Sequence, residues 1–405
     1  MTVVTELELP ELDYLDPTLR GDAFHARMRE LRGQGWLARS PLGCFVLDRE
    51  GVDFFLKSKR LKFPGALVAQ LFGVTEGPLH EEVVKNILCV DGADHRRLRS
   101  LVKPSLTARS VERYRPAIRG FVEELYEPLA AGGRTEFIAD FAKPYPALTI
   151  ATVMGAPLSD AERLFDWSNW IQKQFAQDVL SQRAQIEQAV LEFYAYAHEL
   201  LDARRAYPGD DLISLLIAAE EDGDRLSDDE LVNLVLNILV GGVDTTQSQL
   251  AHAMKLFADH PDQWELLASD PETYAPRAVW EAIRYEPITP FTARIALEEI
   301  EYRGVTFPEG TIVMLSAFDA NRDDAHWDAP EEFDITRERA GKPHTFGAGI
   351  HYCLGANLAR LEMTEALTFL SAHMRELRLG GDPVYGSVNG IYGLDELQLE
   401  FTPVP

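Results

Sequence analysis

The residues with the most specific chemical potential lie in one stretch, Phe346-Gly-Ala-Gly-Ile-His-Tyr-Cys-Leu-Gly355. Gly347 and Gly349 permit a tight loop whose backbone can approach a flat ligand and turn its amides toward a sulfur atom. A helical pattern begins at Cys353, and a cysteine at a helix N-terminus lies at the positive end of the helix dipole, which favours the thiolate. Because the thiolate is the form that binds metals, the stretch predicts that Cys353 is a metal ligand and not an inert buried thiol.

A second unusual segment lies inside a long predicted helix. The helix begins at a capping box, Ser227-Asp-Asp-Glu230, and its pattern runs unbroken to His260-Pro261, where proline ends it. Residues 228–259 would span about 48 Å at about 1.5 Å per residue. The middle carries adjacent glycines, Gly241 and Gly242, which should each cost about 1 kcal/mol in a helix interior. Close approach of a ligand to the helix would explain the two glycines.

The elements around these segments are mainly α with a minor β part. Apolar residues recur at helical spacing in residues 108–130, 159–175, 182–206, 228–259, 276–286 and 354–376. Strand signals predict a hairpin over Trp36–Asp48 that turns at Pro41-Leu42-Gly43, two strands over Ile300–Leu315 around Phe307-Pro-Glu-Gly310, and a strand over Leu397–Phe401. Since the chain has no internal repeat and no low-complexity linker, we expect residues 1–405 to form a single compact domain.

Composition limits the compartment and the partners. Lys and Arg number 39 against 65 Asp and Glu, a formal charge of −26, which argues against nucleic acid or an anionic membrane as the main partner. Three cysteines, Cys44, Cys89 and Cys353, do not form a disulfide framework and indicate a reducing compartment. The N-terminus lacks the features of a signal peptide, and the most apolar stretch, Leu231–Val243, is too short to span a bilayer. We therefore expect a cytoplasmic protein with no membrane attachment.

The stretch around Cys353 resembles the haem-ligand signature of the cytochrome P-450 family, through Phe346, Gly347, Gly349, His351, Cys353 and Gly355. The resemblance extends over nearly the whole chain and implies the cytochrome P-450 fold around a buried heme b (iron protoporphyrin IX). It implies that Cys353 is the iron ligand; a thiolate ligand pushes electron density onto the iron and promotes O–O cleavage. The other haem-binding residues that it implies are Gly241, Phe346 and Gly355 beside the haem, and His95, Arg99, Arg294 and His351 at its propionates.

A charged pair supports the same family. Glu281-Ala-Ile-Arg284 matches the family's Glu-x-x-Arg pair, and the i,i+3 spacing places both charges on one helix face. By resemblance, Arg337 is the third member of this structural triad. The chain departs from the family within Pro330-Glu-Glu-Phe333, where Glu332 stands at a position that many relatives give to arginine.

The glycine-bearing helix matches the family's oxygen-binding segment as Gly241-Gly242-Val243-Asp244-Thr245. The resemblance implies that Thr245 donates to or accepts from a bound peroxide and that Asp244 relays protons from solvent. The implied reaction inserts one oxygen atom of dioxygen into a C–H bond (hydroxylation) or a double bond (epoxidation). Electrons would come from NAD(P)H through a separate ferredoxin and ferredoxin reductase, because the chain has no dinucleotide fingerprint and no length for a flavin or iron–sulfur domain.

The segments equivalent to the family's substrate contacts are mainly apolar and aromatic, which indicates a lipophilic small molecule. They are residues 62–88, Phe165, Trp167 and Trp170, Leu236 and Val240, Ile288–Thr292, and Ile391-Tyr392. A basic block over residues 95–119 opposes the overall acidity, with Arg96, Arg97, Arg99, Lys103, Arg109, Arg113, Arg115 and Arg119 against Glu112 alone. In the family this region lies on the cysteine side of the haem, so we expect the block to dock an acidic ferredoxin.

Three other functions fit parts of the pattern. A peroxygenase on the same fold would use hydrogen peroxide directly, but such relatives replace the acid–alcohol pair that Asp244 and Thr245 form. A haem-binding gas sensor or carrier has no use for a thiolate ligand and a proton relay. A cysteine hydrolase could recruit Cys353 with a histidine and Asn357, but it leaves the glycine-bearing helix unexplained.

Overall fold

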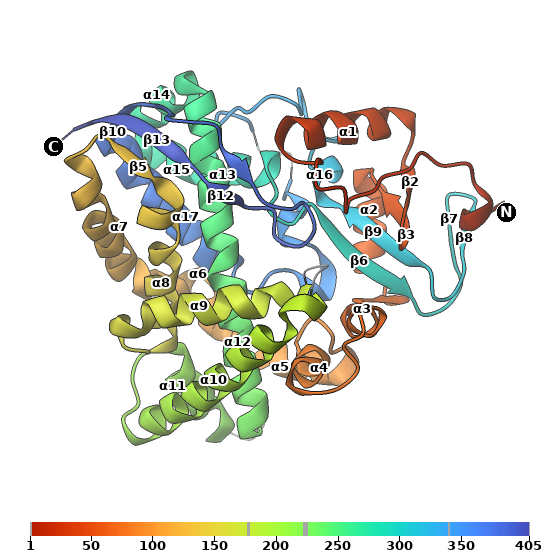
Figure 1. The fold of residues 1–405 in the computed structure, drawn as a ribbon, viewed down its shortest axis with the longest axis horizontal. Helices are drawn as coiled ribbons and strands as arrows, with labels where there is room; N and C mark the ends of the chain where they lie inside the picture. Colours follow the sequence, from red (N-terminus) through yellow and green to blue (C-terminus); the bar gives the residue numbers. More distant parts are fainter. Residues whose placement is uncertain (1, 176–178, 222–225, 339–340, 405) are drawn as a thin grey trace.

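The computed structural model describes residues 2–175, 179–221, 226–338 and 341–404. The fold is mainly helical with small sheets, as the sequence predicts (Figure 1). The helices are α1 (Gly21–Gln34), α2 (Arg49–Lys57), α3 (Gly65–Leu71), α4 (Pro78–Lys85), α5 (Gly92–Val102), α6 (Ala108–Val111), α7 (Arg115–Ala130), α8 (Pro144–Met154), α9 (Ala161–Gln172), α10 (Val179–Ala206), α11 (Leu212–Glu221), α12 (Asp228–Gly242), α13 (Asp244–Asp259), α14 (Pro261–Ser269), α15 (Pro271–Tyr285), α16 (Ala317–Ala320) and α17 (Ala356–His373). The strands are β1 (Thr2–Val3), β2 (Leu37–Ser40), β3 (Gly43–Val46), β4 (Leu61–Lys62), β5 (Arg134–Glu136), β6 (Phe291–Ala296), β7 (Ile300–Tyr302), β8 (Val305–Phe307), β9 (Ile312–Ser316), β10 (Met374–Leu379), β11 (Val384–Tyr385), β12 (Leu394–Glu396) and β13 (Gln398–Pro403).

The largest sheet has the strand order β2-β3-β9-β6-β4. β2 and β3 form the predicted hairpin, with Ser40 opposite Gly43, and β9 lies parallel to β3 and antiparallel to β6. The region predicted to hold two strands, residues 300–315, holds three. Arg303 and Gly304, with φ of 48° and 77°, make an additional turn between β7 and β8. The predicted C-terminal strand is confirmed as β13.

The long predicted helix is present but is not continuous. It begins at the predicted capping box, where the Ser227 amide donates to Glu230 Oε2 at 2.9 Å and the Glu230 amide donates to Ser227 Oγ at 3.2 Å. α12 then ends at Gly242, and α13 begins at Asp244, with Val243 between them at a ψ of −70°. Figure 1 shows α12 and α13 following one another through the middle of the molecule.

The other predicted helices differ from the structure mainly at their ends. The segment predicted over 108–130 is divided into α6 and α7 by a 3-10 turn at Glu112–Tyr114, and Pro116 stands in the first turn of α7, where a missing N–H is tolerated. The others appear as α9, α10, α15 and α17. None of the helices in the described ranges is both long enough and apolar enough to cross a membrane.

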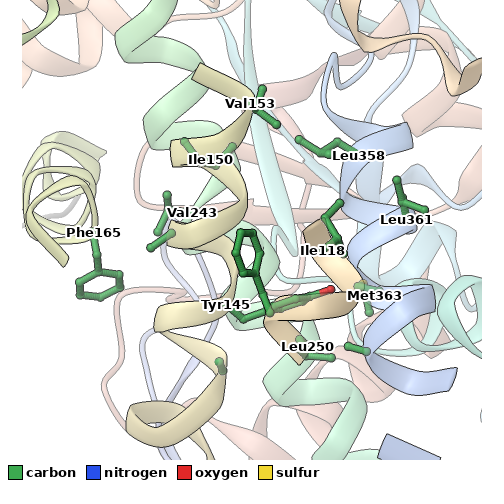
Figure 2. Close-up of a cluster of buried hydrophobic side chains, with 14 of the residues drawn as sticks. Ile118, Tyr145, Ile150, Val153, Phe165, Val243, Leu250, Leu358, Leu361 and Met363 are labelled. Carbon is green, nitrogen blue, oxygen red and sulfur yellow. The ribbon is translucent and has the colours of Figure 1, made fainter. Parts of the chain in front are cut away.

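A large apolar core fixes the middle of the long helix. Figure 2 shows Tyr145 and Ile150 of α8 near Val243, with side chains of α17 on the other side of the cluster. Tyr145 is fully buried and its hydroxyl donates to the Glu362 carbonyl at 2.8 Å. A Cβ atom at Gly242 would lie 2.3 Å from Cδ1 of Ile150. The close packing of α8 therefore explains this glycine, and the predicted ligand explanation applies at most to Gly241.

Candidate active site

The cysteine loop is held by its own backbone and by α2. The Cys353 amide donates to the Phe346 carbonyl at 2.9 Å, which closes the loop. Gly347 and Gly349 both have a φ of 69°, a conformation that side chains disfavour. A Cβ atom at Gly349 would lie 2.9 Å from the Leu56 carbonyl oxygen, so the loop packs directly on the end of α2. The predicted tight loop is confirmed, with both glycines in roles that require glycine.

The Cys353 thiol lies just before α17, which begins at Ala356. Burial raises the pKa of the Cys353 thiol, while the amides of Gly355 and Ala356 and the charge of Arg99 lower it. The helix end thus acts in the predicted direction, against the effect of burial. A coordinated metal would hold the sulfur as thiolate.

Basic side chains from three separate elements converge beside this loop. His95 and Arg99 come from α5, Arg294 from β6 and His351 from the loop itself. The imidazole rings of His95 and His351 have centroids 4.5 Å apart, and Arg99 donates to the Tyr352 carbonyl. Arg294 is buried, and its guanidinium donates to the Ala293 carbonyl at 2.8 Å.

These bases disfavour one another's charged forms. Burial, followed by Arg294, His95 and Arg99, lowers the pKa of His351 to about 3. Burial also lowers the pKa of Arg294 to about 10, and burial with Arg99 lowers the pKa of His95. The acid nearest to His351 is Asp91, whose Oδ1 lies 3.6 Å from His351 Nε2.

Several nitrogen atoms of this cluster lack a partner. His95 Nε2 and both ring nitrogens of His351 are buried with no hydrogen-bond partner among the described residues. A buried polar atom without a partner is costly, so such atoms mark a place where a ligand supplies the missing contacts. Clustered bases with open donor positions fit an anion, and the two carboxylates of a haem satisfy that requirement. The residues present therefore fit the implied cofactor.

The predicted oxygen-binding segment lies at the junction of α12 and α13. Gly241 is exposed, and a Cβ atom there would have no neighbour within 4 Å, so the helix offers open space at this residue. The Thr245 hydroxyl donates to the Gly241 carbonyl at 2.5 Å, which bonds it back to its own helix. Asp244 is half-buried, and burial raises the pKa of its carboxyl to about 7, opposed by Lys173 and Lys143.

A further acid lies behind this junction that motif reasoning did not single out. Glu362 of α17 is buried, and the Thr246 hydroxyl donates to its Oε2 at 3.3 Å. Burial raises the pKa of the Glu362 carboxyl to about 8. The signal in the sequence was a glutamate directly after Leu361, on the apolar side of a predicted helix.

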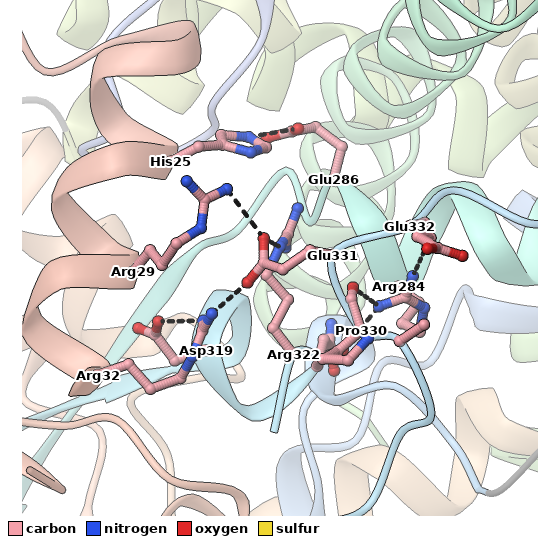
Figure 3. A network of polar contacts seen from close by, with 12 residues as sticks. His25, Arg29, Arg32, Arg284, Glu286, Asp319, Arg322, Pro330, Glu331 and Glu332 are labelled. Atoms are coloured by element: carbon pink, nitrogen blue, oxygen red, sulfur yellow. Dashed lines mark hydrogen bonds and ion pairs between the residues drawn. The ribbon is translucent and has the colours of Figure 1, made fainter. Parts of the chain in front are cut away.

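The charged triad has the predicted members. Arg284 Nη2 and Nε donate to Glu281 at 2.7 and 2.8 Å, and Arg337 Nε donates to Glu281 Oε1 at 3.2 Å. Arg284 also donates to the carbonyls of Pro330 and Glu332, as Figure 3 shows. The Glu332 side chain takes no part in these contacts. The departure from the family at this position therefore leaves the triad intact.

Several of the expected substrate contacts belong to the protein core. Leu236 and Tyr392 are fully buried, and the Tyr392 hydroxyl accepts a hydrogen bond from the Gly21 amide at 2.8 Å. Trp167 is buried and donates to Glu192 at 3.0 Å. For these residues the predicted contact with substrate is wrong, because their surfaces are already covered by protein.

The basic block over residues 95–119 is largely neutralised within the fold. Ion pairs join Arg97 to Glu230, Arg113 to Asp210, and both Arg115 and Arg119 to Glu365. Within the described ranges, the members that are exposed and form no ion pair are Arg96, Lys103 and Arg109.

Comparison with known proteins identifies the family of the chain. The sequence profile described as Cytochrome P450 matches residues 147–270 and 272–375. Luteothin monooxygenase from Streptomyces thioluteus is 37% identical over 399 residues, which cover 97% of this chain and 96% of that protein. Mycinamicin IV hydroxylase/epoxidase from Micromonospora griseorubida is 36% identical over 304 residues, 74% of this chain and 75% of that protein. The crystal structure of CalO2 superposes with a TM-score of 0.90 at 29% identity and covers 98% of this chain and 100% of that one. The chain belongs to the cytochrome P450 family of haem-thiolate monooxygenases.

Proposed function

We propose that the chain inserts one oxygen atom from dioxygen into a C–H bond or a double bond of a lipophilic small molecule. The observation that carries the proposal is the convergence of Cys353 with the unpaired nitrogens of His95 and His351. A relative whose name includes both hydroxylase and epoxidase supports both types of oxygen insertion. Residues 1–405 act as a single catalytic domain in the cytoplasm.

In this proposal each side of the haem is held by its own set of residues. Cys353 would ligate the iron, and Phe346, Gly355 and Gly241 would contact the ring. His95, Arg99, Arg294 and His351 would bind the propionates, whose oxygens would accept from the ring nitrogens that have no hydrogen-bond partner among the described residues. When bound, the haem supplies the iron at which dioxygen is activated.

The protein's own chemical contribution is the movement of protons. A carboxyl with a pKa of about 7 is protonated in roughly half of the molecules at neutral pH, so Asp244 can both take a proton from solvent and pass it on. Once the Thr245 hydroxyl gives up its bond to the Gly241 carbonyl, it can receive that proton at Oγ1 and donate its own, because a hydroxyl is both donor and acceptor. The open space at Gly241 leaves room for a small diatomic molecule beside this hydroxyl.

Electrons come from NAD(P)H through a ferredoxin reductase and a ferredoxin. Arg96, Lys103 and Arg109 are the side chains of the basic block that pair with no acid in the described part of the chain, so they are the ones available to an acidic partner. Arg96 lies in α5, Lys103 directly follows it and Arg109 lies in α6. α5 also carries two of the residues assigned to the propionates.

The proposal is tested by the absorption spectrum of the dithionite-reduced protein with carbon monoxide. We expect the red-shifted Soret band of thiolate-ligated haem in the wild-type protein and in Cys89→Ser, and its loss in Cys353→Ser. Cys89 is a matched control because its thiol is half-buried and its pKa is also raised by burial. A red-shifted band that survives in Cys353→Ser would show that another residue is the iron ligand.

A further inference from the structure

A connected polar cluster ties α12 to α4 and α10 in a region that is otherwise apolar. Glu82 of α4 accepts at Oε2 from the Tyr194 hydroxyl of α10 at 2.7 Å and from Asn233 Nδ2 of α12 at 2.8 Å. Asn237 Nδ2 donates to Asn233 Oδ1 at 3.0 Å and to the Asn233 carbonyl at 2.6 Å. Glu82 and Asn233 are only 1% and 4% exposed. Solvent therefore does not satisfy these groups, and the bonds within the cluster do.

The cluster fixes which way each amide faces. Where Glu82 is ionised its Oε2 can only accept, so the group of Asn233 that faces it is the donating Nδ2. The Asn233 Oδ1 atom then points along α12 toward Asn237, which must offer its own Nδ2. Both N–H groups of Asn237 are used by Asn233. The atom of Asn237 left over is Oδ1, a hydrogen-bond acceptor with no partner among the described residues.

Asn237 lies one helical turn before Gly241 on α12. It precedes Gly241 by four residues, so the two share one helix face about 6 Å apart along the axis. Asn237 is half-buried and Gly241 is exposed, whereas Leu236 and Val240, one residue before each of them, are buried. The acceptor oxygen of Asn237 therefore lies on the less buried face of α12, together with Gly241.

We propose that Asn237 determines substrate specificity by accepting a hydrogen bond at Oδ1, and that the substrate is a lipophilic molecule with a hydroxyl or N–H donor there. Asn233 and Glu82 are positioning residues, since they act on the substrate only through the orientation of the Asn237 amide. This inference rests on the proposed function, because it requires the space beside Gly241 to be the substrate site. It narrows the substrate class from apolar compounds to compounds with one donor group at a defined position.

The experiment uses 1-phenylimidazoles as probes, because the imidazole nitrogen ligates haem iron and the phenyl ring then projects into the substrate space. The ring carries a hydroxyl, a methoxy or a methyl group at the ortho, meta or para position, and Kd is measured by the shift of the Soret band. We expect one hydroxyl isomer to bind roughly 3- to 10-fold more tightly than its methyl and methoxy counterparts, the usual effect of one neutral hydrogen bond. Equal binding of methoxy and hydroxyl isomers would overturn the inference, because it means that no acceptor faces the ligand.

Three variants distinguish the loss of a specific contact from a general destabilisation of the binding site. Asn237→Leu should bring the hydroxyl-to-methyl affinity ratio to about one, and Glu82→Gln should lower the hydroxyl-to-methoxy ratio, because glutamine no longer fixes the amide orientation. Ile238→Leu, a half-buried neighbour on the same helix, should leave both ratios unchanged. A ratio that persists in Asn237→Leu, or that falls equally in Ile238→Leu, contradicts the role of Asn237. A ratio that persists in Glu82→Gln removes Glu82 from the positioning role.

Failure of the proposed function and failure of the role given to Asn237 would produce different spectra. If the protein is not a haem-thiolate enzyme, the reduced carbon monoxide complex lacks the red-shifted Soret band before any probe is added. If only the specificity inference fails, that band is normal and the probe isomers bind alike. Thermal unfolding of each variant shows whether it is folded when Kd is measured.

Discussion

At the scale of single residues, the hydroxyl of Thr245 is the group whose removal tests proton delivery most directly. It donates to the Gly241 carbonyl at 2.5 Å and follows Asp244, whose carboxyl pKa burial raises to about 7. We expect Thr245→Ala to bind substrate and consume NAD(P)H with its partners, but to divert electrons to peroxide or excess water, with proton delivery slowed by roughly 10²-fold. The measurement is product and hydrogen peroxide formed per NAD(P)H consumed.

Thr245→Ser is the matched control, because it keeps a hydroxyl at the same position. If Thr245→Ala and Thr245→Ser couple NAD(P)H to product equally well, the hydroxyl has no part in proton delivery, and Thr246 becomes the next residue to test.

Glu362 gives a prediction about stability rather than turnover. Burial raises the pKa of its carboxyl to about 8 in the folded protein, whereas an unfolded glutamate titrates near pH 4.5. Between these values the folded state binds a proton that the unfolded state has lost, so the free energy of unfolding falls as pH rises. The loss should be on the order of a few kcal/mol by pH 8. The Glu362→Gln protein should lose less stability over this range. Its free energy of unfolding relative to wild type, measured by urea unfolding, should therefore increase between about pH 5 and pH 8. A difference between the two proteins that is independent of pH would contradict the raised pKa.

Residue type and spacing identified the cysteine loop, the Glu-x-x-Arg pair and the glycine-bearing helix, because each is local in sequence. The approach of His95 to His351 could be expected only through resemblance, since spacing alone does not bring such distant residues together. The net effect of burial on Cys353 and the bond between Glu82 and Asn233 could not be predicted, because both depend on elements that meet only in the folded chain.

At the scale of elements, Gly349 tests how the cysteine loop is supported. Its φ of 69° alone should cost alanine about 1–2 kcal/mol, and a Cβ atom would also meet the Leu56 carbonyl at 2.9 Å. We expect Gly349→Ala to lower the melting temperature and to weaken haem binding. Gly310→Ala is the control, because Gly310 has a similar φ of 82° but no atom within 4 Å of an added Cβ. It should lower the melting temperature and leave haem binding unchanged; equal effects on haem binding would mean that the contact with Leu56 is unimportant.

The element boundaries that differ from prediction have local causes. The apolar pattern of residues 228–259 continues through Val243, which is buried, so side-chain periodicity does not register the change of backbone at that residue. In the β region, the turn at Arg303 and Gly304 was hidden because Pro308 and Gly310 give a stronger turn signal nearby. A helix or strand can thus be located by periodicity while its interruptions are missed.

At the scale of the whole molecule, the electron-transfer partner must find a small basic area on a protein with a formal charge of −26. We expect Arg96→Glu with Arg109→Glu to slow reduction by an acidic ferredoxin at low salt and to reduce its dependence on ionic strength, with probe binding unchanged. The measurement is the rate of haem reduction by ferredoxin in a stopped-flow instrument. Arg134→Glu with Arg375→Glu makes the same change of charge on β5 and β10 and should have little effect. Equal slowing by both pairs would point to overall charge rather than to docking at this area.

The hydrogen bonds of Arg284 and Arg337 to the main chain predict which positions of this segment can vary among related proteins. Both guanidinium groups bind main-chain carbonyls of residues 329–332, and a carbonyl is present whatever side chain the residue carries. We therefore expect the main-chain path of this segment and the two arginines that bind it to be preserved. Substitution at position 332 should be tolerated. A library with every amino acid at position 332 should yield many haem-loaded members, whereas a library at position 284 should yield almost none. Distant homologues are thus better recognised by these two arginines than by the side chains of residues 329–332.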